Sequence, residues 1–222
     1  MINVAIDGPA GAGKSTIART AAKELGFIYV DTGALYRAVG VYNLRKNIDT
    51  KDADAVASTL KDIKVELKFV DSEQHVILNG DDVSTEIRLP EASMAASNVS
   101  AIPAVRSFLF DLQRDIASKN NCIMDGRDIG TVVLPNADVK IFLTADPEER
   151  ARRRFLELQA KGDPSTYEEV LADLKVRDYQ DSHREIAPLK PAEDSIVINT
   201  TGNELEQSVK IICDTIKENI NG

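Results

Sequence analysis

The stretch Gly8-Pro9-Ala10-Gly11-Ala12-Gly13-Lys14-Ser15 decides how the start of the chain is interpreted. It follows a short, largely apolar run at residues 2–6 and precedes residues 15–25, where apolar side chains recur at helical spacing. The order strand, glycine-rich loop and helix lets successive backbone N–H groups converge on one anion, and the helix adds the positive end of its dipole. The stretch therefore predicts a loop that binds nucleotide phosphates.

Two side chains at the end of the loop strengthen this prediction. Lys14 is placed to reach the β- and γ-phosphates of a triphosphate, and Ser15 offers a hydroxyl oxygen to Mg²⁺. A glycine-rich turn without a ligand would require neither residue. The loop predicts a triphosphate site but does not reveal what happens to the triphosphate.

Further short apolar runs, rich in β-branched or aromatic residues, alternate with helical patterns along the chain. They lie at residues 27–30, 122–124, 139–143 and 196–198. Such alternation predicts an α/β fold with a parallel sheet that is covered by helices on both faces.

Two regions interrupt this alternation. Residues 64–70 and 75–78 alternate in character around the polar turn Asp71-Ser72-Glu73-Gln74, which predicts an antiparallel hairpin within an insertion at about residues 62–104. The insertion also contains a second turn, Asn79-Gly80-Asp81-Asp82, and Pro103 signals a helix start just before its end. The second region, residues 146–191, begins with the helix-start sequence Asp146-Pro147-Glu148-Glu149 and has a polar break at 161–165. The core then comprises about residues 1–61, 105–145 and 192–222.

Composition limits the partners of this chain of 222 residues. Lys and Arg number 27 and Asp and Glu 36, so the net charge of −9 repels polynucleotides and anionic membranes. No apolar stretch approaches the roughly 18 residues of a membrane span, and no export signal opens the sequence. Cys122 and Cys213 belong to no paired spacing, which suits a reducing compartment. We expect a cytoplasmic protein.

Arginines are concentrated at one place in this acidic chain. Arg150, Arg152, Arg153 and Arg154 fill four of five positions, and helical spacing puts all but Arg152 on one face. The simplest alternative is a solvated face paired with glutamates. A bound anion explains the run as a whole better than a solvated face does.

A second group, Arg177, Asp181 and Arg184, recurs at i, i+4 and i+7 and is predicted to lie on one helix face. An intrahelical salt-bridge ladder is its alternative interpretation. Phosphoryl transfer requires positioning and charge neutralisation more than covalent chemistry, so arginines on a mobile lobe would suit it. Residues 146–191 are the candidate lid.

Other classes of triphosphate-binding protein fit less well. GTP switches usually carry an Asn-Lys-x-Asp motif, which this sequence lacks. Mechanical ATPases commonly end an apolar strand in a carboxylate pair, whereas the run at 122–124 leads into Asp125-Gly126-Arg127-Asp128. That segment combines a possible metal or water organiser with a phosphate-binding arginine.

The motifs together resemble the bacterial cytidylate kinase family, a branch of the nucleoside monophosphate kinases with a P-loop kinase core. The likeness covers essentially the whole chain and rests on four segments: residues 6–16, residues 31–37, residues 125–133 and the set Arg177-Asp178, Asp181, Arg184 and Pro188-Leu189. The insertion at 62–104 also resembles the monophosphate-binding lobe of these enzymes. The resemblance implies Mg-dependent transfer of the ATP γ-phosphate to CMP or dCMP.

The resemblance also implies roles for individual residues. The ATP-binding residues are Gly8, Pro9, Ala10, Gly11, Ala12, Gly13, Lys14, Ser15 and Thr16, and Ser15 is the protein ligand of Mg²⁺. The catalytic residues are Lys14, Arg127, Arg154 and Arg184. Arg37, Arg127 and Arg184 hold the acceptor phosphate; Thr32, Tyr36, Arg177 and Asp181 border its sugar and phosphate; Ser97, Arg106 and Asp128 read the cytosine.

The last three residues are chemically suited to cytosine, because a carboxylate complements its exocyclic amine and an arginine complements its N3 and O2 acceptors. Uracil reverses the donor or acceptor character of two of these atoms and would leave polar groups mispaired. Two alternatives stay open at this stage: a kinase for another small acceptor, and a nucleotide-dependent switch that transfers no phosphate. The family likeness suggests a monomer.

Overall fold

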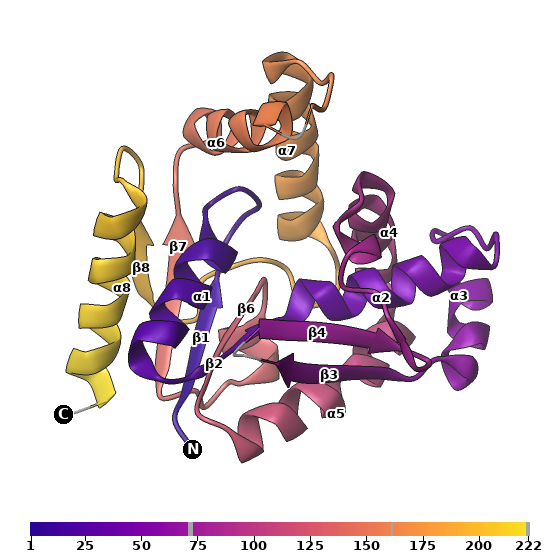
Figure 1. The fold of residues 1–222 in the computed structure, drawn as a ribbon, viewed down its shortest axis with the longest axis horizontal. Coiled ribbons are helices and arrows are strands. Elements are labelled where there is room, and N and C mark those ends of the chain that lie inside the picture. Colours follow the sequence, from indigo (N-terminus) through magenta and orange to yellow (C-terminus); the bar gives the residue numbers. More distant parts are fainter. Residues whose placement is uncertain (71–72, 161, 221–222) are drawn as a thin grey trace. The chain divides into compact units, whose positions relative to one another are not determined.

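The computed structural model describes residues 1–70, 73–160 and 162–220. These residues form two compact units, Met1–Ile28 with Asn121–Gly222, and Tyr29–Asn120. Figure 1 labels the elements of both units. Each unit is described by itself.

The first unit is built on parallel strands around β1 (Asn3–Asp7). The sheet has the order β2-β6-β1-β7-β8, with β2 (Ile28–Asp31) at the edge where the chain leaves the unit, and with β6 (Cys122–Gly126), β7 (Val139–Thr144) and β8 (Ile196–Asn199). Val4, Ala5 and Ile6 of the central strand are fully buried, as expected for a strand covered on both faces. The predicted parallel α/β sheet is confirmed.

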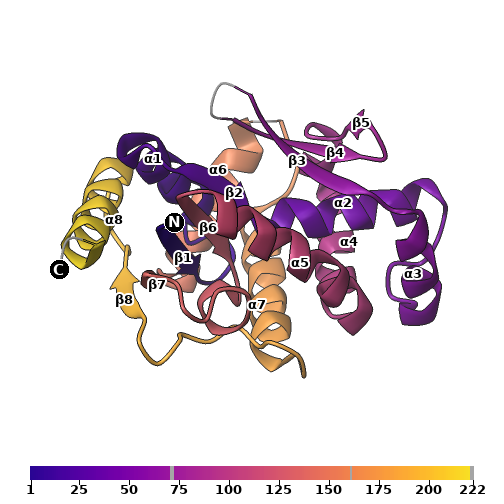
Figure 2. The same ribbon diagram turned by 90° about the horizontal axis from the view of Figure 1, so that it is seen from below.

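Two helices, α1 (Lys14–Leu25) and α8 (Leu205–Ile220), pack against this sheet, and the unit also contains α6 (Pro147–Ala160) and α7 (Tyr167–His183). α1 and α8 lie side by side (Figure 2), and the apolar residues of α1 predicted to face the sheet, Ile17, Ala18, Ala21 and Ala22, are buried. α6 and α7 pack against each other, and a capping box at Thr166 and Glu169 starts α7. The region from 146 to 191 thus contains two helices, and the first begins at the predicted helix-start sequence.

The second unit joins a helical layer to a separate antiparallel sheet. Its helices and 3₁₀ turns are α2 (Thr32–Arg45), α3 (Ala53–Thr59), η1 (Leu60–Asp62), η2 (Glu86–Arg88), α4 (Pro90–Ser100) and α5 (Pro103–Lys119). Its sheet has the order β3-β4-β5, formed by Val65–Val70, Glu73–Leu78 and Asp81–Asp82. Leu35, Val99 and Leu109, from α2, α4 and α5, are fully buried in its apolar core.

The hairpin was predicted correctly but its turn was not. Glu73 and Gln74, expected in the turn, pair with Val70 and Phe69 in the β3–β4 ladder. Strand pairing satisfies their backbone groups, which outweighs the turn preference of polar side chains. Asp71 and Ser72, the rest of the predicted turn, lie outside the described residues. Asp81 and Asp82 of the second predicted turn likewise form β5, and Asn79 and Gly80 make the turn.

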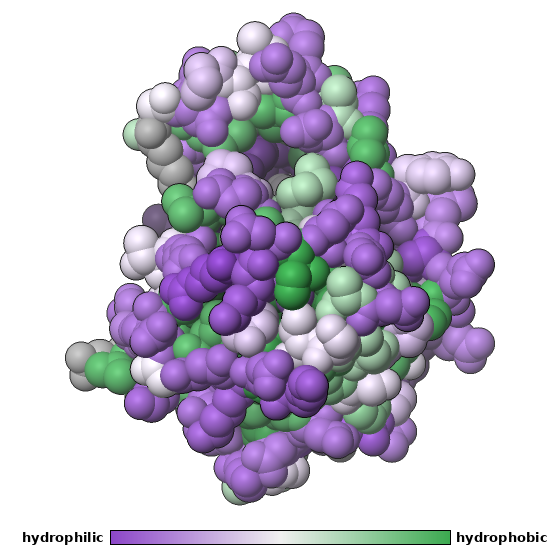
Figure 3. Space-filling view, turned by 90° about the vertical axis from the view of Figure 1, so that its right-hand side faces the viewer, coloured by the Kyte–Doolittle hydropathy of each residue, from purple (hydrophilic) through white to green (hydrophobic). Residues whose placement is uncertain are grey.

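The described part of the chain contains no helix with both the length and the apolar character needed to cross a bilayer. Hydrophilic residues predominate on the face drawn in Figure 3.

Candidate active site

The predicted phosphate-binding loop connects the carboxyl end of β1 to the first turn of α1. Gly8 has a φ of +152°, and a Cβ at this position would lie only 2.0 Å from the carbonyl oxygen of Leu143, so no other residue fits there. Gly13 precedes α1 in a left-handed conformation, with a φ of 84°. The loop therefore has the backbone geometry that only glycine supplies at these points.

Lys14 is buried at the base of this loop, where its Nζ donates to the carbonyl oxygen of Pro9 at 2.6 Å. Burial and the nearby Arg127 lower the pKa of Lys14 to about 7, although Asp125 and other carboxylates act in the opposite direction. Phosphate oxygens would replace the lost hydration and favour the charged ammonium. A bound phosphate would therefore raise the pKa of Lys14 and keep it charged.

Ser15 links the loop to the end of β6. Its hydroxyl donates to Oδ2 of Asp125 at 2.9 Å, and Asp125 is buried. A hydroxyl and a carboxylate side by side are both oxygen donors of the kind that Mg²⁺ prefers. Residues 1–70, 73–160 and 162–220 contain no group of three or more His, Cys, Asp or Glu that could hold a metal ion, so this pair would need phosphate oxygens and water to complete a magnesium shell.

The segment Asp125-Gly126-Arg127-Asp128 begins in the last two residues of β6 and leads into a π-helical turn, η3 (Ile129–Val133). Nε of Arg127 donates to Oδ2 of Asp181 at 2.8 Å, and Nη2 of Arg184 donates to Oδ1 of Asp128 at 3.3 Å. Single π-helical turns are rare and occur often at functional sites. The structure thus brings residues of two predicted motifs, 125–128 and 177–184, into direct contact.

α7 supplies the second half of this cluster, with one difference from the sequence prediction. Arg177 and Asp181 lie on α7, but the helix ends at His183, and Arg184 is its C-cap in an extended conformation. The prediction that Arg184 lies on the helix is therefore wrong. Its Nε instead donates to the carbonyl oxygen of Ala187 at 2.6 Å, which stabilises the chain reversal after the helix.

Asp181 is a largely buried carboxylate of this cluster and pairs with Arg127. Burial alone would raise its pKa, but Arg127, followed by Arg184 and Arg177, lowers the pKa below the ordinary value. The ionised form of Asp181 is thus stabilised by arginines from both predicted motifs.

The remaining predicted acceptor residues lie in the second unit. Asp31 caps α2, and its Oδ2 accepts from Nη2 of Arg37 at 2.6 Å. Nε of Arg37 is buried and has no hydrogen-bond partner within the described segments. An unpaired buried guanidinium N–H is costly, so this arginine has donor capacity left for a ligand.

Tyr36, Ser97 and Arg106 come from α2, α4 and α5 of this unit. The Arg106 guanidinium lies over the Tyr36 ring, 5.9 Å from its centre, and donates to the carbonyl oxygen of Ser100, one helical turn after Ser97. Thr32, the first residue of α2, is buried. Among the predicted acceptor residues, the structure thus shows contacts of Arg106 with Tyr36 in the second unit, and of Arg127 with Asp181 and Arg184 with Asp128 in the first.

The four arginines of α6 differ in their surroundings. Arg150 is buried, and its Nη1 donates to the carbonyl oxygen of Ala10 in the phosphate-binding loop at 2.9 Å. Arg153 donates to the carbonyl oxygen of Thr200 at 2.7 Å, and Arg154 pairs with Glu157 at 3.1 Å on the surface.

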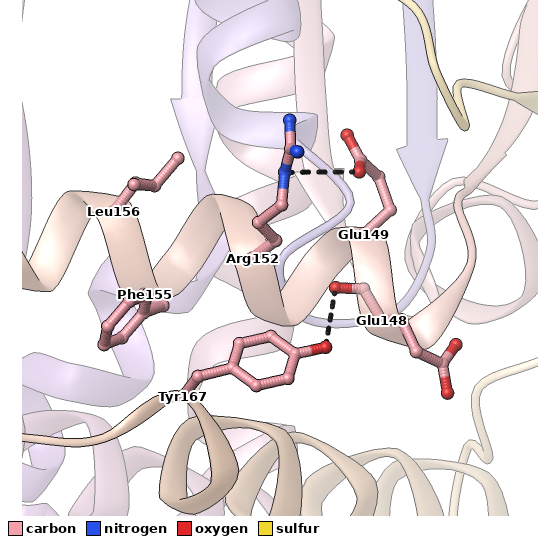
Figure 4. Close-up of a pocket in the computed structure, with 6 residues that line it drawn as sticks. All are labelled: Glu148, Glu149, Arg152, Phe155, Leu156 and Tyr167. Carbon is pink, nitrogen blue, oxygen red and sulfur yellow. Dashed lines mark hydrogen bonds and ion pairs between the residues drawn. The ribbon is translucent and has the colours of Figure 1, made fainter.

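Arg152 points elsewhere, as its helical position predicts. It lines a hollow of about 580 Å³ whose other lining residues are Glu148, Glu149, Phe155, Leu156 and Tyr167 (Figure 4). None of the predicted site residues lines this hollow.

Two residues with clear roles in the geometry were not singled out from the sequence. Asp7 accepts hydrogen bonds from the backbone of η3, and Asp178 pairs with Arg150 at 2.7 Å. Burial raises the pKa of Asp7 to about 6, although the two backbone N–H groups act in the opposite direction. Asp7 and Asp178 both stand inside the quoted motifs, but only the contacts reveal what each carboxylate does.

The parallel sheet, the glycine-rich loop between β1 and α1 and the buried Lys14 define a P-loop nucleotide-binding protein, and arginines paired with carboxylates beside the loop are typical of its kinases. A family model described as cytidylate kinase matches residues 4–218. The chain belongs to the cytidylate kinase family, which are transferases of the nucleoside monophosphate kinase class. The predicted resemblance is confirmed, and neither the switch nor a kinase for another acceptor is favoured.

Relatives match over nearly the whole chain. The chain is 51% identical to the cytidylate kinase of Caldicellulosiruptor bescii over 213 residues, which cover 96% of this chain and 94% of that protein. It is 50% identical to the cytidylate kinase of Carboxydothermus hydrogenoformans over 215 residues, 97% of each chain. Among solved structures, an uncharacterized protein from Eubacterium ventriosum has a similar fold, with a TM-score of 0.55 at 13% identity and coverage of 98% and 99% of the two chains.

Proposed function

We propose that this chain transfers the γ-phosphate of ATP to CMP or dCMP, which gives ADP and the cytidine diphosphate. The observation that carries the proposal is the pairing of β1 with β6, in which Asp7 stands opposite Gly126. The phosphate-binding loop and the Asp125–Asp128 segment therefore start side by side at one edge of the sheet, where ligands bind in open parallel sheets. A donor loop next to an arginine-bearing turn is the layout that phosphoryl transfer requires.

The donor half of the proposed site comprises residues 8–16. Backbone N–H groups of the loop would hold the phosphates, and Lys14 would exchange its bond to Pro9 for the β- and γ-phosphates. Ser15, with Asp125 beside it, would hold Mg²⁺, which when bound neutralises charge on the phosphate oxygens.

The acceptor half would use residues from both units. Arg37, Arg127 and Arg184 are proposed for the phosphate, and the unpaired Nε of Arg37 supports this role. Thr32, Tyr36, Arg177 and Asp181 would border the sugar and phosphate, and Ser97, Arg106 and Asp128 would read the base. A monophosphate is already an anionic nucleophile, so no dedicated general base is needed.

Residues 146–191 are proposed as a lid and residues 62–104 as a monophosphate-binding lobe inserted in the core. Arg154 is proposed to reach the transferring phosphoryl group, since its pairing with Glu157 is a surface contact that costs little to break. A lid that excludes water would suppress idle hydrolysis of ATP. We further propose that the enzyme is a monomer in the cytoplasm; the free, buried Cys122 and Cys213 agree with a reducing compartment.

A coupled assay of ADP release with CMP, dCMP, UMP and AMP tests the proposal. We expect rapid ADP formation with CMP or dCMP and slower turnover with UMP and AMP. Equal or greater activity with UMP or AMP would overturn the base assignment, and ATP hydrolysis that ignores CMP would indicate a switch. The Asp128→Ala variant is expected to narrow the preference for CMP over UMP, whereas a kinase for another acceptor would keep its preference.

A further inference from the structure

Asp7 is the last residue of β1 and directly precedes the phosphate-binding loop. Its side chain is buried, with the residue 5% exposed. Oδ1 accepts the backbone N–H of Ile129 at 2.8 Å, and Oδ2 accepts that of Gly130 at 2.7 Å. Both oxygens thus tie β1 to the start of η3, more than a hundred residues further along the chain.

The N–H groups at the start of a helical turn have no partner within the turn and need an outside acceptor. In the part of the chain that the structure describes, Asp128 is the N-cap residue of η3, and its side chain makes no capping hydrogen bond there. Asp7, at the end of β1, supplies the acceptors for these N–H groups. The two anchored N–H groups immediately follow Arg127 and Asp128, so they determine where these two side chains leave the backbone.

Anchoring a turn with a buried carboxylate costs free energy. Burial raises the pKa of Asp7 to about 6, so its ionised form is disfavoured compared with water. Only a carboxylate, however, presents an acceptor to both N–H groups at once, since an amide would turn a donor toward one of them. The cost of its burial indicates a requirement for geometry at this point.

We propose that Asp7 is a positioning residue for the acceptor nucleotide, which fixes the turn carrying Arg127 and Asp128 at the side of the donor loop. This inference rests on the acceptor roles proposed above for those two residues. Asp7 acts through the turn and touches no substrate atom.

Asp7 could instead act on the donor through Lys14. The contacts favour the turn: in the described part of the chain Asp7 makes no ion pair or hydrogen bond with Lys14, whose Nζ donates to Pro9. Among the carboxylates that raise the pKa of Lys14, Asp7 ranks after Asp125 and Asp181. Its direct hydrogen bonds all run to η3.

The test is Asp7→Asn, which keeps the shape and one acceptor. Asp138→Asn is the matched control, because Oδ2 of Asp138 accepts the N–H of Asn3 at 2.7 Å, at the opposite end of the same strand. For Asp7→Asn we expect the KM for CMP to rise about 10-fold and the preference for CMP over UMP to narrow, because one buried N–H loses its acceptor. The KM for ATP should change less than about 2-fold, and the control should match the unmodified enzyme.

A fall in kcat with an unchanged KM for CMP would overturn the inference, since Asp7 would then affect folding or the chemical step without affecting the binding of the acceptor. A rise confined to the KM for ATP would overturn it as well, because the carboxylate would then act through Lys14. If Asp7 acts through the turn, the effects of Asp7→Asn and Arg127→Ala on the KM for CMP should be less than additive in the double variant. Full additivity would contradict this.

Arg127→Ala also separates the two levels of the proposal. If Arg127→Ala raises the KM for CMP but Asp7→Asn leaves it unchanged, only the role of Asp7 is refuted. An unchanged KM for CMP in Arg127→Ala refutes the acceptor assignment and the role of Asp7 together.

Discussion

Arg150 and Arg152 show how differently two arginines of one helix can be used. The Arg150 side chain is 4% exposed and that of Arg152 is 70% exposed. Arg150 donates to the carbonyl oxygens of Ala145 and Ala10 and to Asp178, at 2.8, 2.9 and 2.7 Å. A planar guanidinium with several donors can satisfy three acceptors at once, which lysine cannot do in the same geometry.

We predict that Arg150→Ala lowers the free energy of unfolding by on the order of 3 kcal/mol, because it leaves buried carbonyl and carboxylate oxygens without a donor. Arg152→Ala is the control on the same helix, and its effect should stay within about 0.5 kcal/mol, since its ion pair with Glu149 is exposed. Urea unfolding of both variants measures the difference. Similar losses in the two variants would mean that Arg150 is not a structural link.

The run of arginines illustrates the limit of sequence interpretation at this scale. Helical spacing separated Arg152 from its neighbours correctly, because direction around a helix depends only on position. It could not distinguish Arg150, which is buried against Ala10, from Arg154, which pairs on the surface. Burial depends on what packs against the helix, and those partners come from distant parts of the chain.

At the scale of elements, the phosphate-binding loop packs against the two helices that follow β7. Gly11 has a φ of +72°, and a Cβ at this position would lie 3.2 Å from atoms of Arg150 and Leu174. α6 and α7 therefore touch the tip of the loop directly. The shape of the loop depends on these helices as well as on its own glycines.

Gly11→Ala and Gly26→Ala separate these two contributions. Gly26 has a similar φ of +70°, but a Cβ there meets nothing within 4 Å. Both variants should lose roughly 1 kcal/mol of stability through left-handed strain, and only Gly11→Ala should also raise the KM for ATP, because the loop must shift. Thermal unfolding and steady-state kinetics measure the two effects; an unchanged KM for ATP in Gly11→Ala would show that the loop tolerates the contact.

Elements with strong local signals were predicted well. The strands around residues 2–6, 122–124, 139–143 and 196–198 and the helices starting near Ser15, Pro103 and Pro147 are present. The π-helical turn η3 was not predicted, because its first N–H groups are anchored by Asp7, which no local pattern reveals. Arg184 was placed on α7 by its spacing, but the helix ends one residue earlier.

For the whole molecule, motifs indicated which segments contribute to the proposed site but not how their side chains pair. Local spacing placed Arg177, Asp181 and Arg184 together, and both arginines do lower the pKa of Asp181, but spacing could not reveal that Arg127 hydrogen-bonds to Asp181 and Arg184 to Asp128. Those pairs join segments more than fifty residues apart. Pairing of this kind follows from the order of the strands and the path of the helices, so it requires the fold.

The proposed acceptor residues are divided between the two units, and this leads to a prediction for the whole chain. The second unit contains Thr32, Tyr36, Arg37, Ser97 and Arg106; the first contains Arg127, Asp128, Arg177, Asp181 and Arg184. The proposed donor residues 8–16 all belong to the first unit. Amide hydrogen exchange therefore distinguishes the two ligands, because exchange slows where a ligand stabilises the local structure.

A non-hydrolysable ATP analogue with Mg²⁺ should slow exchange in residues 8–25 and leave residues 90–106 nearly unchanged. CMP alone should slow exchange in both units, in residues 32–37 and 97–106 as well as 126–131 and 177–184. UMP at the same concentration is the control and should give weaker protection, since it mispairs with the proposed base-reading residues. Protection by CMP in one unit only would remove the residues of the other from the acceptor site, and would show which half of the assignment must be revised.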